Sequence, residues 1–187
     1  MPVGQATTTP LPVGPDCADK KKNSKWDDCM CGQVCEMVRV YNESQAPKEK
    51  LEPSPSEPGT QGRSAYEKSI SDFETNFAAV VNKHKPNLDH PDIKKMFYSP
   101  PAGNPPPPPA DCQHAKWKAA GGSATPARSG PGAMNPDHMH PANLSGPLTA
   151  GNLRWADARV NYTVGGGMKK IKEAPKKMQA HSSCNCP

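Results

Sequence analysis

Apolar side chains are scarce in this sequence. Only 34% of its 187 residues are hydrophobic and 5% are aromatic, whereas 24 are prolines. Proline fixes φ and removes a backbone donor, so it interrupts helices and inner strands. The composition excludes one large, well-filled globule. It predicts a small core, stabilised by metal, disulfides or a partner, with much irregular chain.

Long hydrophobic runs are also absent. No stretch of about 18 apolar residues occurs, so we expect no membrane-spanning helix and no membrane partner. The first residues, MPVGQATTTPLPVG, lack the basic and apolar regions of a secretory signal peptide. We therefore expect a protein made in the cytoplasm that, if it is exported, leaves by a route that does not read such a peptide.

Paired C-x2-C zinc knuckles are missing as well. The seven cysteines are an odd number, so at least one is unpaired within the chain. Disulfides, which need an oxidising compartment, or free thiols are favoured over thiolate-bound zinc. A structural Zn²⁺ ion at cysteine and histidine residues is the alternative, with Cys112, His114, His181, Cys184 and Cys186 as its ligands.

Positive charge gathers in the second half of the chain. Residues 1–109 carry 13 Lys/Arg and 14 Asp/Glu, whereas residues 110–187 carry 10 and 4. On charge alone, lysines that keep a surface soluble are the simpler explanation. The alternative is a polyanionic partner, nucleic acid first.

The residue pattern divides the chain into four sections. Residues 1–62 form a proline-rich leader with a cysteine cluster, in which 26–41 predict a short helix or strand and 42–62 a linker. Residues 63–99 are a helical segment, 100–110 a polyproline linker, and 111–187 a further domain. No internal repeat of 20–50 residues is visible. The pair Asp89-His90 is read as a turn.

The clearest helix is predicted over 63–83. Its apolar residues recur every three or four positions and so share one face, which we expect to pack in the core: Tyr66, Ile70, Phe73, Phe77, Val80 and Val81. Ser64 and Glu67 have the spacing of a capping box at the start of this helix.

The stretch NPDHMHPANLSGPLTAGNLRWADARVN holds a set of polar residues at informative distances. Asp137-His138 is followed by Pro141 and Gly146, Asn152 lies 15 residues after Asp137, and Asn161 lies 9 residues after Asn152. Turn chemistry explains why asparagine, glycine and proline are common here, but it does not explain the two distances.

These residues and their spacing resemble the HNH, or ββα-metal finger, nuclease motif over roughly 112–172. The resemblance implies an α+β fold: a small ββα-metal core with a helical, proline-rich and irregular N-terminal extension. Asp137-His138 would lie on the first strand, Asn152 near the turn and Asn161 on the helix, which we expect to be 151–161. The segment SGPGAM is weakly apolar for that strand.

The chemistry of phosphodiester hydrolysis fits these residue types. Asp137 and Asn161 offer oxygen ligands for Mg²⁺ or Mn²⁺, and His138 can take a proton from water while Asn152 orders the loop around it. His140 is expected to be a solvated loop histidine, and it and His181 are the accessory candidates. Phosphate contacts are expected from Arg154, Arg159, Lys169, Lys170 and Lys172.

The resemblance therefore implies a metal-dependent endonuclease that cuts DNA, or alternatively RNA, with low sequence specificity. Small basic units of this kind resemble bacterial toxin domains, including type VI effectors, which are secreted into target cells by a specialised system and require a cognate immunity protein. One alternative is a non-enzymatic Cys/His metal module that binds nucleic acid or protein. Another is a secreted, disulfide-stapled interaction protein.

Overall fold

The computed structural model describes residues 11–13, 26–45, 55–56, 58–99, 111–170 and 178–180. The predictions for the polyproline linker at 100–110, for Lys172, for His181 and for the two C-terminal cysteines lie outside these residues. The elements are β1 (Leu11–Val13), α1 (Asp28–Gln45), α2 (Arg63–His84), α3 (Pro91–Lys94), α4 (Cys112–Ala119), β2 (Met134–His138), η1 (Ala142–Leu144), η2 (Ala150–Asn152), β3 (Leu153–Asp157), α5 (Ala158–Lys170) and β4 (Met178–Ala180).

The described elements confirm the α+β class. Strands β2 and β3 form an antiparallel pair, with Pro136 opposite Trp155 and His138 opposite Leu153, and α5 follows β3 directly. Strands β1 and β4 pair in parallel. Across 130–165 the chain therefore runs from a strand through a loop to a second strand and a helix. No helix in the described part of the chain combines the length and hydrophobicity needed to cross a bilayer.

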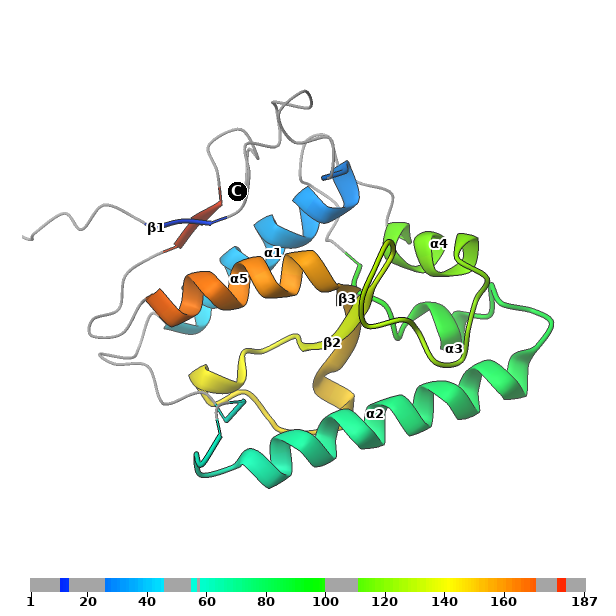
Figure 1. Ribbon diagram of the computed structural model, residues 1–187, viewed down its shortest axis with the longest axis horizontal. Coiled ribbons are helices and arrows are strands. Elements are labelled where there is room, and N and C mark those ends of the chain that lie inside the picture. Colours follow the sequence, from blue (N-terminus) through cyan, green and yellow to red (C-terminus); the bar gives the residue numbers. More distant parts are fainter. Residues whose placement is uncertain are drawn as a thin grey trace, which may run out of the picture.

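The β2–β3 pair lies between helices (Figure 1). α5 and α1 lie on one side of it, and α2 runs along the other. Successive side chains of a strand point to opposite faces, so each face of the pair packs against a different helical layer. Met134, Leu153 and Trp155 pack with α2, whereas Ala156 packs with α5 and α1.

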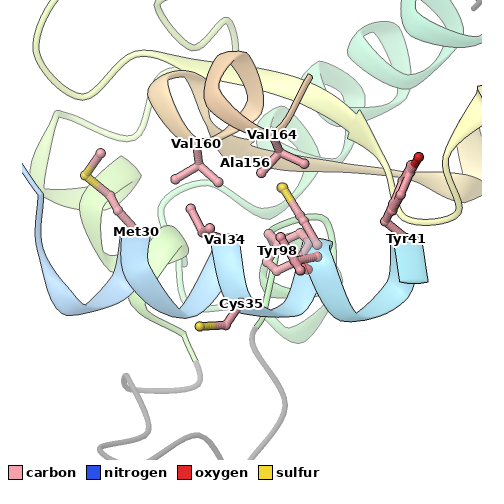
Figure 2. Close-up of a cluster of buried hydrophobic side chains, with 10 residues drawn as sticks. Met30, Val34, Cys35, Tyr41, Tyr98, Ala156, Val160 and Val164 are labelled. Carbon is pink, nitrogen blue, oxygen red and sulfur yellow. The ribbon is translucent and has the colours of Figure 1, made fainter. Parts of the chain in front are cut away.

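Helix α1 supplies much of the hydrophobic core on the α5 side of the strand pair. Its buried residues recur at helical spacing, and the Asp27 carboxylate accepts a hydrogen bond from the Met30 amide at 2.9 Å, which caps the first turn. Figure 2 shows Val34 of α1 facing Val160 and Val164 of α5. Residues 26–41, for which the sequence left helix and strand open, are thus mainly helical.

Helix α2 supplies the second core. Phe73, Phe77 and Val81 are buried, as its apolar stripe predicted, and Phe77 packs edge-on against Trp155 and Trp117 with ring centroids 5.3 and 5.7 Å apart. The predicted capping box was wrong. Gly62 is the N-cap and its φ is positive, while Glu67 instead accepts a hydrogen bond from Arg63 at 2.7 Å.

The expectation of a helix over 151–161 was also wrong. Residues 153–157 form β3, and α5 begins only at Ala158. Backbone hydrogen bonds explain the difference: β3 pairs with β2, and Trp155 also exchanges hydrogen bonds with Met96 and Tyr98, each 2.9 Å long. The Asp157 carboxylate then accepts a hydrogen bond from the Arg159 amide at 2.9 Å, so the helix starts here.

The N-terminal helix is joined to the rest of the fold by a disulfide and a buried amide. Cys29 of α1 is bonded to Cys112 of α4, and Cys31 and Cys35 are disulfide-bonded as well. Gln33, fully buried, donates to Gln113 at 2.7 Å and accepts from the Asp157 amide at 3.0 Å. Its side chain thus satisfies groups on α4 and at the start of α5.

Candidate functional site

His138 is the last residue of β2 and is buried against α2. Its ring stacks on Tyr66 with centroids 5.2 Å apart, and its Nε2 lies 3.4 Å from the Ser69 hydroxyl. Ser69 donates its proton to the Tyr66 carbonyl at 2.7 Å, so its oxygen is left to accept from Nε2. This arrangement places the lone pair of the neutral ring on Nδ1. Burial lowers the pKa of His138 to about 4, so the ring is unprotonated at neutral pH.

Asp137 precedes His138 and points to the opposite face of β2, toward the layer that holds α5. Burial raises the pKa of its carboxyl group to about 7, partly offset by a hydrogen bond from the His138 backbone amide. Among the described residues, no basic side chain forms an ion pair with it. The carboxylate therefore has no positive countercharge near it, which is the state of an oxygen ligand before a divalent cation binds.

Asn152 fastens the loop that follows His138. Its Oδ1 accepts from the His140 amide, and its Nδ2 donates to the carbonyls of His140 and Pro147, all at 3.0 Å. The Met139 amide also donates to the Asn152 carbonyl at 2.8 Å. Gly146 is buried in the same turn, where a Cβ would meet the carbonyl oxygens of His140 and Pro141. The loop around His138 is thus tightly specified.

Asn161 lies on the second turn of α5 and is half-buried. α5 packs against β2, so the helix that carries Asn161 is next to the strand that carries Asp137. His138 lies on the other face of the strand, against Tyr66 and Ser69 of α2. The proposed base and the helix that carries Asn161 are therefore on opposite sides of β2.

One of the proposed phosphate contacts, Arg154, differs from its expected position. Arg154 lies on β3 rather than on a helix, and it donates to the carbonyls of Gly151 and Leu153 at 3.0 and 2.6 Å. Its guanidinium group is therefore engaged with the backbone, which was not expected of a phosphate contact. Arg159 and His140 are exposed. Lys169 and Lys170 are at the end of α5, but their side chains are outside the described part.

The proposed zinc ligands near Cys112 are otherwise occupied. Cys112 is in the disulfide with Cys29, so it offers no thiolate. His114 is buried, and its Nε2 lies 2.8 Å from the Leu88 carbonyl oxygen. The interpretation of these two residues as zinc ligands was wrong, because folding of α1 onto α4 brings Cys29 to Cys112.

The first turns of α2 complete the site, which sequence reasoning missed. Tyr66 and Ser69 contact His138, and the Arg63 guanidinium lies 5.9 Å from the centre of the Tyr66 ring. Burial and the nearby Asp137 carboxylate raise the pKa of Tyr66. Arg128, on the loop before β2, stacks over Trp155 and pairs with Glu74. Ser69 offered one signal, since it is a polar residue within the apolar face of the helix.

Comparison of the chain with family models, with curated proteins and with solved structures found no match. The assignment of function therefore depends on the residues themselves.

Asn152→Ala is expected to loosen the loop after His138. Three side-chain hydrogen bonds are lost, which should cost the closed loop about 2 kcal/mol and accelerate amide exchange across residues 139–147 roughly thirtyfold. Hydrogen–deuterium exchange followed by mass spectrometry measures this. Thr149→Ala is the control, because Thr149 is exposed in the same loop and makes no side-chain cap hydrogen bond. Equal exchange in both variants would contradict the proposed function of Asn152 in ordering the loop.

Asp137→Asn is expected to stabilise the chain above pH 7 in the presence of EDTA. The folded chain keeps the Asp137 proton up to about pH 7, whereas the unfolded chain releases it near 3.8, so stability falls as the pH rises through this interval. The shift corresponds to at most about 4 kcal/mol, and solvent screening of a half-buried group reduces this to about 2 kcal/mol.

The pH dependence of urea unfolding tests this expectation. In Asp137→Asn the lowered pKa of His138 acts alone, so stability should rise between pH 4 and 6.5 and then level off. Asp72→Asn, on the exposed face of α2, is expected to change stability by less than about 0.5 kcal/mol. A variant at position 137 that is less stable than the wild type at pH 8 would refute the prediction.

Proposed function

We propose that the protein is a metal-dependent HNH-type endonuclease that hydrolyses DNA with low sequence specificity. The observation that carries the proposal is the order β2–β3–α5 with Asp137-His138 at the end of the first strand, Asn152 before the second strand and Asn161 on the helix. The spacing in the sequence alone is a weaker argument, because asparagine and glycine are common in turns.

The residues present suit a hard divalent cation. Asp137 and Asn161 would hold Mg²⁺ or Mn²⁺ through oxygen atoms, and the bound ion would neutralise charge on the phosphate and on the departing 3′ oxygen. The desolvated Asp137 carboxylate, which has no basic partner among the described residues, supports such a ligand set.

His138 is proposed to take the proton from the attacking water. A low pKa keeps the ring unprotonated at neutral pH, and the Ser69 hydroxyl favours the tautomer with its lone pair on Nδ1. Tyr66 restricts the orientation of the ring through stacking. Arg63 and Arg128 lie beside Tyr66 and Trp155, and each would have to release a carboxylate partner, Glu67 or Glu74, before it could contact a phosphate.

We further propose that the nuclease is a toxin delivered to other cells. Disulfides persist in oxidising compartments, so the Cys29–Cys112 bond supports a chain that leaves the cytoplasm. A type VI or similar secretion system would carry it, and an immunity protein would protect the producing cell.

The test is the conversion of supercoiled plasmid by the purified chain with Mg²⁺ or Mn²⁺, with linear single-stranded DNA and RNA assayed in parallel. Cleavage should require the cation and stop with excess EDTA. Faster degradation of the RNA would identify RNA rather than DNA as the substrate. Cleavage that continues in EDTA would refute the metal-dependent mechanism.

A further inference from the structure

A second cluster of ligand-type side chains lies between α2 and α3. His84 is the last residue of α2, His90 is the N-cap of α3, and Asp92 is in the first turn of α3. Their ligand atoms all lie within 4.8 Å of one another, and they are the only such group of histidine, cysteine or acidic residues in the described part of the chain.

The distances within this cluster suit a tetrahedral ion. Asp92 Oδ2 is 3.4 Å from His84 Nε2 and 3.7 Å from His90 Nδ1. Ligand atoms about 2.0–2.1 Å from a tetrahedral zinc ion are separated by roughly 3.3–3.4 Å. The two imidazole rings are stacked, with centroids 3.5 Å apart and planes 15° from parallel. Both rings would therefore have to turn away from each other before their nitrogen lone pairs point at one ion.

The two histidine nitrogens of the cluster differ in their hydrogen bonds. His84 Nε2 is buried, and no hydrogen-bond partner for it occurs in the described structure. His90 Nδ1 accepts a hydrogen bond from the Asp92 amide at 3.1 Å, so this nitrogen carries a lone pair, as metal binding requires. Lys95 pairs with Asp92 Oδ1 at 2.7 Å, whereas the two histidines face Oδ2.

We propose that His84, His90 and Asp92 bind a zinc ion that fastens the end of α2 to the start of α3. Two imidazoles and one carboxylate favour zinc or a similar transition metal over Mg²⁺, which prefers oxygen ligands. The ion would satisfy His84 Nε2 and take the place of the amide hydrogen bond at His90 Nδ1. About a third of the His90 side chain is exposed, so solvent can supply a fourth ligand.

This site is independent of the proposed nuclease site. His138 contacts residues at the first two turns of α2, whereas His84 is at the other end of this 22-residue helix. Loss of cleavage and loss of zinc binding can therefore be separated by mutation.

Zinc titration of the untagged full chain, stripped with EDTA and desalted, tests the proposal. Competition with a chromophoric chelator should give one zinc at this cluster, lost in His84→Gln, in Asp92→Asn and in His90→Asn, where asparagine keeps an N-cap. His140→Gln and Asp89→Asn are the matched controls, because His140 is exposed in another loop and Asp89 is outside the cluster. His138→Ala should also keep this zinc.

A second measurement removes the dependence on folded variants. In the wild-type chain, long-range ¹H–¹⁵N spectra should show zinc-induced shifts at two of the six histidines, assigned to His84 and His90. Zinc should also raise the unfolding temperature of the wild type but not that of Asp92→Asn. Equal zinc affinity in all variants, a wild type that binds no zinc, or shifts confined to other histidines would each overturn the proposal.

Discussion

Replacing His138 with alanine should lower the rate of plasmid cleavage by about 10²–10⁴-fold, which is the usual contribution of a positioned general base. The unprotonated His138 side chain lies at the end of β2, in contact with Ser69 and Tyr66. Alanine has no group that could accept the proton of the attacking water. The affinity for Mn²⁺, followed by electron paramagnetic resonance, should change little, because Asp137 and Asn161 are the proposed ligands.

His140→Ala is the matched control for this variant. It removes an imidazole two residues away, but that side chain is exposed and leaves the stacking on Tyr66 intact. Circular dichroism establishes that both variants fold. Wild-type cleavage by the folded His138→Ala variant would exclude His138 as the base, and a co-purifying nuclease would appear as equal activity in all preparations.

The Cys29→Ala/Cys112→Ala pair should destabilise the fold by about 4 kcal/mol. The disulfide closes a loop across a sequence separation of 83 residues. Without the disulfide the unfolded chain has more conformational entropy, so unfolding becomes more favourable. Both sulfurs are buried, so alanine avoids placing an unpaired hydroxyl group in the core. Urea unfolding of the oxidised wild type and the double variant measures the difference.

The slope of the unfolding transition serves as the internal control. A longer reach of the unfolded chain increases the surface exposed on unfolding, so the slope should rise modestly while the midpoint falls. Loss of less than about 1 kcal/mol would mean that Gln33 and the apolar contacts of α1 suffice to hold the N-terminal helix in place.

Local periodicity carried much of the fold prediction. The spacing of Tyr66, Phe73 and Phe77 predicted α2, because an apolar residue at every third or fourth position reflects the geometry of the helix alone. The hairpin was implied by the resemblance of this segment to the HNH motif. The stretch at 153–157 was misassigned to the helix because its strand pairs partly with Met96–Tyr98, far away in sequence.

The candidate site was predictable only along the strand. The HNH resemblance assigned Asn152 to the loop around His138, and all of these residues belong to one short stretch of the sequence. Tyr66 and Ser69 reach His138 through tertiary packing, and periodicity could classify them only as one helical face. His84 and His90 meet because the chain reverses after α2, a reversal that residue spacing alone does not define.

The buried Gln33 links the candidate site to α1, so the site is not expected to fold as a separate unit. Its amide satisfies Gln113 of α4 and the backbone at Asp157, where β3 passes into α5. A fragment that begins at residue 111 would retain every proposed catalytic residue, yet it would expose these polar groups and the apolar face of α5. Transplanting the motif to another protein would therefore require a substitute for α1, and recombination within this gene should keep the two halves together.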